Sequence, residues 1–169
     1  GVCLGVPAAG GGAGAEAGGA MATLGAAGYE VDWAPPTARR AVGLPRRMDP
    51  DYVDPPLGRS VTSAEVAEKV KGLEASDRLD NPINLSELLP ERPYRSSNNY
   101  LREQEAYFKA VEGAGAKLLA DFDAILIVGG SGPIVDLVNN QRVHHLTLTF
   151  YRADTPVGAE CYGVACLAF

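Results

Sequence analysis

The chain has 169 residues, the usual size of one domain, and we expect a single domain over residues 1–169. Hydrophobic residues make up 46% and charged residues 21%, which excludes a mainly disordered chain, and no apolar run approaches the ~18 residues of a membrane span. The net charge of −6 and the scattered basic residues argue against nucleic acids and membranes as partners.

The first third of the chain predicts the start of a parallel α/β sheet. Residues 2–6 are a short apolar run, typical of a buried strand before a glycine-rich turn. Residues 15–27 predict a helix with a face of small side chains, and Gly28 is a natural helix end. Residues 29–34 alternate like a second strand. This order of strand, helix and strand is typical of parallel α/β folds.

The middle of the chain, residues 35–120, predicts an insertion that caps the functional site. Residues 35–60 are rich in Pro, Arg and Asp and predict irregular structure. Helices are expected over residues 62–79, where Thr62 or Ser63 can cap the helix, and over residues 101–112. The stretch is longer than ordinary loops, which suggests a functional role. Candidate lining residues are Tyr94, Arg95 and Tyr100.

The last third returns to regular structure. Residues 124–128 form a continuous apolar run, typical of a central parallel strand, and GGSGP (129–133) closes it. A helix is expected over residues 134–152 and a short strand over residues 156–160. Residues 161–163 lie at the tip of this strand, and the apolar residues 164–169 predict a final helix directly after them.

Cys161 carries the strongest chemical signal, because it lies between a predicted strand and a predicted helix. A nucleophile on such a turn lies at the carboxyl edge of the sheet, where a helix N-terminus favours the reactive thiolate. Gly163 lets the turn close. A small buried cysteine at a strand end is the alternative. Cys3 and Cys166 are expected in the core. The number of cysteines is odd and no C-x-x-C is present, so a reducing, cytoplasmic compartment is the default.

Two further features become informative beside Cys161. The glycines of GGSG, with Gly130 and Ser131, can direct backbone N–H groups at an anion or oxyanion, although a plain turn is the simpler interpretation. Glu16 is the only acid in an apolar, glycine-rich segment, and a solvated helix residue is its simpler interpretation.

Cofactor and metal sites are not predicted. The glycine-rich residues 12–19 (GAGAEAGG), with Asp32 at the end of the next strand, suggest a dinucleotide-binding turn, but no frame completes G-x-G-x-x-G and Glu16 would face the pyrophosphate. His144 and His145 are adjacent, so they face different directions on a helix, and surface positions are expected for both. The chain has no other histidine for a multi-histidine metal site.

Four segments, in order, resemble the ThiJ/PfpI superfamily, and its longer glyoxalase III-like members most closely. They are AEAGGAMATLGAAGYEV (15–31), LDNPINLSEL (79–88), DFDAILIVGGSGPIVDLVNN (121–140) and PVGAECYGVACL (156–167). The resemblance implies an α/β fold with a doubly wound parallel sheet, of the flavodoxin-like or class I glutamine-amidotransferase-like kind, with a cap insertion. It also implies a homodimer. Since that fold continues after the nucleophile elbow, we expect a further C-terminal segment, as a second chain or as additional residues.

The resemblance also implies roles for single residues. Cys161 is the implied nucleophile and Glu16 the acid that touches its sulfur. The backbone N–H groups of Gly130 and Tyr162 would form the oxyanion hole. Many relatives carry His where this chain has Tyr162 and where it has Ser131, so a Cys–His–acid triad is absent from these residues. Glu160 either orients a polar group of the substrate or points to solvent, and Ser131 is a candidate substrate contact.

These inferences predict a cysteine-dependent hydrolase or lyase without a cofactor, acting on a carbonyl or related electrophilic small molecule. Cys161 would attack, backbone N–H groups would stabilise the oxyanion and Glu16 would transfer the proton. Three alternatives stay open. The chain could be a non-catalytic redox-stress sensor or chaperone in which Cys161 oxidises, a biosynthetic tailoring enzyme, or a nicotinamide enzyme.

Overall fold

A four-stranded parallel sheet forms the centre of the protein. The computed structural model describes residues 2–6, 14–37 and 49–168. The sheet contains β1 (Val2–Val6), β2 (Glu30–Trp33), β5 (Ala124–Ile127) and β6 (Val157–Ala159), in the order β2-β1-β5-β6, and all neighbours are parallel. The chain moves outward from β1 to β2, then crosses to β5 and moves outward in the other direction. This confirms the prediction of a doubly wound α/β fold.

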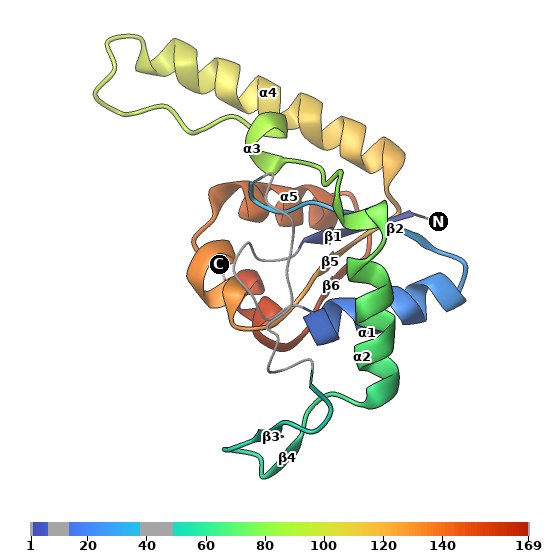
Figure 1. The fold of residues 1–169 in the computed structure, drawn as a ribbon. Coiled ribbons are helices and arrows are strands. Elements are labelled where there is room, and N and C mark those ends of the chain that lie inside the picture. The colour runs from blue at the N-terminus through green and yellow to red at the C-terminus, as the bar shows by residue number, and fades with distance from the viewer. Residues whose placement is uncertain (1, 7–13, 38–48, 169) are drawn as a thin grey trace.

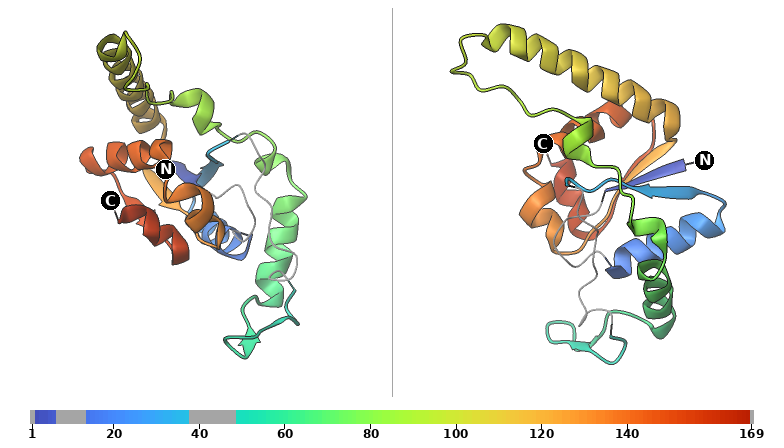
Figure 2. Two further views of the ribbon diagram at one scale, coloured as in Figure 1. Left: turned by 90° about the vertical axis from the view of Figure 1, so that its left-hand side faces the viewer. Right: turned by 45° about the horizontal axis from the view of Figure 1, so that its top comes forward.

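Helices cover both faces of the sheet, because crossovers that run in opposite directions place their helices on opposite faces. On one face, α1 (Gly14–Ala26) connects β1 to β2 and packs against α2 (Ala64–Glu74). On the other face, α5 (Gln141–Arg152) connects β5 to β6, with α4 (Tyr100–Asp121) packed beyond it. Figures 1 and 2 show these two helical layers on either side of the strands.

Three apolar clusters form the core among the described residues, and two of them lie against the sheet, one on each face. The larger cluster lies between the sheet and α5, and includes Ile125, Ile127, Leu146 and Phe150, each with 1% or less of its surface exposed. The smaller cluster lies beside α1 and is composed of Ala17, Met21, Trp33, Leu79 and Val128. Ile127 and Val128 are adjacent and belong to different clusters, so the carboxyl end of β5 is buried from both sides, as predicted for a central strand.

The segment between β2 and β5 contributes to both helical layers. It contains a small hairpin of β3 (Val53–Asp54) and β4 (Arg59–Ser60), then α2, the 3₁₀ turn η2 (Asp77–Leu79), α3 (Leu85–Leu88) and α4. The side chain of Ser63 caps α2 by accepting a hydrogen bond from the N–H of Val66, at 3.3 Å. Figure 1 shows α2 beside α1 and α4 near α5, with the hairpin projecting away from the sheet. The role of residues 35–120 as a cap stays a prediction.

The helix predicted over residues 134–152 is wrong as a single element. Residues Pro133–Leu137 form a π-helical turn, η3, and α5 begins separately at Gln141. The break has a local cause, since the side-chain oxygen of Asn140 accepts hydrogen bonds from the backbone N–H groups of Arg142 and Val143. This is the geometry of a helix N-cap, which starts a new helix at this position.

The helix predicted over residues 101–112 is longer than expected, because α4 continues to Asp121 through two glycines. Ala114 and Leu118 continue its buried face. At Gly115 an added Cβ would lie 2.8 Å from Cγ2 of Thr149 in α5, so glycine allows the two helices to approach closely. Among the described residues, no helix combines the length and apolar character needed to cross a membrane.

Candidate functional site

Cys161 lies on a tight turn directly after β6, at the carboxyl edge of the sheet. Its φ angle is +49°, in the left-handed region that non-glycine residues seldom adopt. The N–H of Glu160 donates to the carbonyl of Ile127 at 3.1 Å, and the N–H of Gly163 donates to the carbonyl of Glu160 at 2.8 Å. These two bonds fix the turn on both sides of Cys161. The geometry is that of a nucleophile elbow, in which a strained turn presents a side chain above the sheet.

The glycine turn after β5 packs directly against this elbow. A Cβ at Gly129 would lie 2.5 Å from the Cβ of Cys161 and 2.9 Å from the carbonyl oxygen of Glu160. A Cβ at Gly163 would lie 2.6 Å from the carbonyl oxygen of Ile127. Neither position has room for a Cβ atom, so glycine is required at both. The absence of side chains there lets the backbones of the two turns pack directly against each other. In parallel α/β sheets, ligands bind at this edge, where the strand order reverses; here that point lies between β1 and β5.

The residues that the sequence predicted for an oxyanion hole lie on these two turns. Gly130 follows Gly129 and has a φ of +89°, a conformation that favours glycine. Tyr162 follows Cys161 and its side chain is 55% exposed. Ser131 is exposed beside Gly130. After Cys161 the chain forms a 3₁₀ helix, η4 (Cys161–Leu167), in place of the predicted start at residue 164.

Two carboxyl groups interact electrostatically at the elbow, since the charge of Glu16 acts on Glu160, the residue before Cys161. Glu16 is in the first turn of α1 and is half-buried. Burial raises the pKa of Glu160, and the nearby Glu16 carboxylate raises that pKa further. Oε1 of Glu160 is buried and has no hydrogen-bond partner among the residues that the structure describes. The residue as a whole is half-buried, so both sequence interpretations of Glu160 stay open.

The described cysteine side chains differ in their surroundings. Cys161 is free and exposed, whereas Cys166 is free and 0% exposed in the core. Burial raises the pKa of the Cys166 thiol, and the nearby Asp136 raises it further. A buried thiol with a raised pKa is a poor nucleophile, so Cys166 is a core residue as predicted. The backbone of Cys3 pairs with Val31 and Ala124 in the sheet, and its side chain lies outside the described residues.

The two histidines do not occupy ordinary surface positions, and this prediction is wrong. Both are half-buried in α5. Nε2 of His144 lies 2.7 Å from the carbonyl oxygen of Val138, and Nε2 of His145 lies 2.6 Å from the hydroxyl of Tyr107 in α4. Sequence reasoning missed this contact because it joins residues on different helices. Within the part of the chain that the structure describes, no group of three or more His, Cys, Asp or Glu side chains could hold a metal ion.

Comparisons with known proteins agree with this architecture. A family model described as ThiJ/PfpI family-like matches residues 9–169 of the chain, whereas no curated protein matches it. Among solved structures, glyoxalase III from Candida albicans is 18% identical, with a TM-score of 0.62, and the match covers 98% of this chain and 58% of that one.

Two further solved structures are similar. The match to a ThiJ/PfpI domain protein from Brachyspira murdochii has 17% identity and a TM-score of 0.54, and covers 99% of this chain and 62% of that one. Rapid Encystment Protein 24 kDa from Francisella tularensis is 19% identical, with a TM-score of 0.56 and coverage of 98% and 60%. This chain therefore spans about 60% of the length of these structures. The structural likeness shows the fold, and the family model extends over nearly the whole sequence: the chain belongs to the ThiJ/PfpI family.

Proposed function

We propose that this protein is a cysteine-dependent hydrolase or lyase that acts on a small carbonyl compound or a related electrophile. The observation that carries the proposal is the exposed Cys161 in a left-handed conformation at the carboxyl edge of the sheet, directly after Glu160, whose pKa is raised by burial and by the charge of Glu16. An exposed thiol with a proton acceptor nearby is the minimum that nucleophilic addition to a carbonyl requires. The glyoxalase III neighbour supports the choice of a carbonyl substrate.

The proposed first step adds the Cys161 thiol across the carbonyl double bond. The thiol proton passes to Glu16, the sulfur forms a bond to the carbonyl carbon, and the π electrons move to the oxygen. The backbone N–H groups of Gly130 and Tyr162 stabilise this oxyanion, and the proton then returns to it from the carboxyl group. The product of this step is a hemithioacetal, with no atom or electron left over.

The carboxyl pair gives Glu160 a role in this scheme. Its raised pKa makes Glu160 easier to protonate than an ordinary carboxyl group, and a protonated carboxyl group can donate a hydrogen bond. We assign to Glu160 the binding of a polar group of the substrate, since its buried Oε1 has no partner among the described residues. Ser131 is a second substrate contact in this proposal.

The test compares two alanine variants of the same residue type. Cys161→Ala is expected to abolish consumption of methylglyoxal, the probe dicarbonyl, whereas Cys166→Ala keeps it, because Cys166 is in the core. Glu16→Gln is expected to lower turnover by about 10²-fold, in the usual range for a general acid–base group. Equal activity of Cys161→Ala and the unmodified protein would contradict the proposal.

The exposed thiol beside a carboxyl group also suits a second function, that of a redox sensor in which Cys161 is oxidised to the sulfinic acid. Peroxide treatment followed by intact-mass analysis distinguishes the two functions. Selective oxidation of Cys161 without any turnover of carbonyl compounds would favour the sensor.

A further inference from the structure

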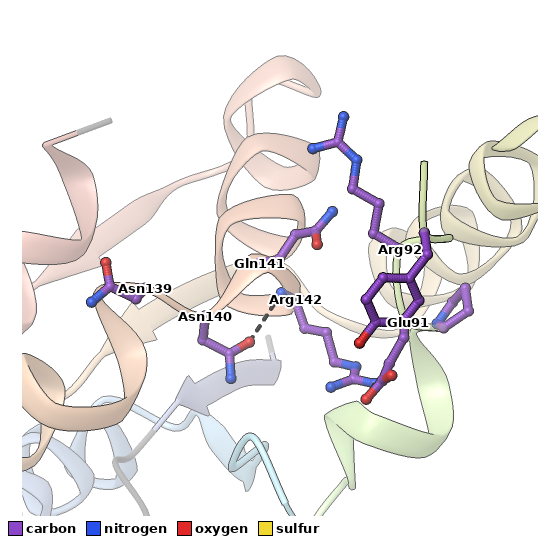
Figure 3. A pocket seen from close by; sticks show the side chains of 8 residues that line it. Glu91, Arg92, Asn139, Asn140, Gln141 and Arg142 are labelled. Carbon is purple, nitrogen blue, oxygen red and sulfur yellow. Dashed lines mark hydrogen bonds and ion pairs between the residues drawn. The ribbon is translucent and has the colours of Figure 1, made fainter. Parts of the chain in front are cut away.

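A polar cavity of about 360 Å³ lies between the loop before α4 and the start of α5. Its lining residues include none from the elbow or the glycine turn, although Tyr94 is one of the candidates that the sequence offered for lining the functional site. The lining residues are Pro90, Glu91, Arg92, Tyr94, Asn139, Asn140, Gln141 and Arg142. Figure 3 shows that the two sides come from segments far apart in the sequence, residues 90–94 and residues 139–142. Its size lies within the usual range of small-molecule sites, about 300–1,000 Å³.

Positive charge gathers at this cavity although the chain as a whole is acidic. Arg142 is partly compensated, since its Nε donates to the carbonyl of Leu89 at 2.7 Å and its Nη2 lies 3.7 Å from Oε1 of Glu91. No carboxylate among the described residues pairs with Arg92. The cavity therefore carries two guanidinium groups against one carboxylate, and the positive end of the α5 dipole adds to them. The side chain of Asn140 already accepts hydrogen bonds from two N–H groups at that end of the helix. The main contribution of the helix to the cavity is therefore its dipole, and not hydrogen-bond donors.

A network of hydrogen bonds fixes one wall of the cavity. Nε2 of Gln141 donates to the hydroxyl of Tyr107 at 2.7 Å, and that hydroxyl lies 2.6 Å from Nε2 of His145. Burial lowers the pKa of His145, and the positive charge of Arg92 lowers it further. A lowered pKa favours the neutral ring, and because the Tyr107 hydroxyl already accepts from Gln141, it can donate its own proton to Nε2 of His145 in the tautomer that leaves this nitrogen free to accept. Gln141 is thereby held in place next to Arg92, and in Figure 3 both side chains point to the same side of the cavity.

We propose that this cavity binds a small molecule that carries an oxyanion, either a carboxylate or a phosphate group. The Arg92 guanidinium binds the oxyanion, because its planar N–H groups can donate two parallel hydrogen bonds to two oxygens of the anion. Arg142 supplies a second positive charge. The amide side chains of Asn139 and Gln141 provide neutral hydrogen bonds to the rest of the ligand. The site is independent of the chemistry at Cys161.

The test is a titration of the protein with inorganic phosphate and, separately, with citrate, at constant pH and with ionic strength held by potassium chloride. The signal is the Cε1–H resonance of His145 in the NMR spectrum, assigned by its absence from the His145→Asn variant. This ring is linked through Tyr107 to the cavity wall, so it reports on this cavity and not on Cys161. The titration with phosphate tests for a phosphate ligand, and the titration with citrate tests for a carboxylate ligand.

Arg92→Gln and Arg95→Gln are the matched variants, because both arginines are exposed on the same loop and Arg92 alone of the two lines the cavity. Saturable shifts with at least one anion are expected. Arg92→Gln should weaken that binding by about 10-fold or more, as for the loss of a charge-assisted hydrogen bond, and Arg95→Gln by less than about 2-fold. The proposal is overturned if neither anion gives a saturable shift, or if both variants weaken binding equally.

Discussion

Replacing Gly129 by alanine tests how Cys161 is positioned. The added Cβ would lie 2.5 Å from the Cβ of Cys161, whereas ordinary contacts begin at 3.4 Å, so one of the two turns must move by about 0.9 Å. Neither neighbouring atom can rotate away, because one is a Cβ and the other a backbone carbonyl oxygen. Such overpacking costs about 1–3 kcal/mol of stability. A displacement of about 1 Å at a reacting group can cost about 10²-fold in rate.

The assay measures two quantities for Gly129→Ala, the midpoint of thermal unfolding and the rate at which iodoacetamide alkylates Cys161. We expect a lower midpoint and a changed alkylation rate. Gly113→Ala is the control, because Gly113 is exposed in α4 and its added Cβ meets nothing within 4 Å. Alanine there is expected to stabilise the helix by about 0.5–1 kcal/mol. Unchanged stability and alkylation in Gly129→Ala would refute the view that close backbone packing sets the position of Cys161.

Three further predictions concern Glu160 and the hydrogen-bond network of Tyr107, Gln141 and His145. Burial raises the pKa of Glu160, so ionisation of this carboxyl group destabilises the fold as pH rises above about 4.5. In urea unfolding, Glu160→Gln should therefore be more stable than the unmodified protein at pH ~7, and this gain in stability should vanish at pH ~4. The pKa of His145 is lowered from 6.5, so the stability that the neutral ring contributes should be lost as pH falls below 6.5. In the same urea assay, His145→Gln should lose less stability than the unmodified protein when the pH is lowered through this range. Tyr107→Phe should cost about 1 kcal/mol by deleting the hydroxyl that joins Gln141 to His145, and an unchanged unfolding midpoint would argue against that network.

Much of the sheet could be predicted from the sequence, because the relevant signals are local. The apolar run at 124–128 and the glycines after it specify a buried strand and its turn without help from distant residues. Gly28 also ends α1 as expected, with a φ of +84°. The elbow at Cys161 follows from a strand, a small turn and a glycine in immediate succession. These are the places where local preference and tertiary structure agree.

The helices on the outer face were harder to predict, since tertiary contacts decide them. Gly113 and Gly115 argue for an end to α4, yet Gly115 is where α4 meets Thr149 of α5. The break before α5 depends on the Asn140 cap, which a periodic apolar pattern hides. The electrostatic influence of Glu16 on Glu160 has no local signal, because 144 positions separate them in the chain; only the family resemblance implied that Glu16 reaches the elbow.

The left-handed backbone at Cys161 has a consequence for the way this protein would respond to selection. Such a conformation costs a side-chain-bearing residue about 1–2 kcal/mol, and glycine avoids that cost. Folding by itself thus disfavours a thiol at the elbow. If a library of variants were selected for heat resistance alone, glycine should accumulate at position 161 and reactivity should disappear with it. Retention of cysteine in the survivors would require a demand for the sulfur in the selection itself.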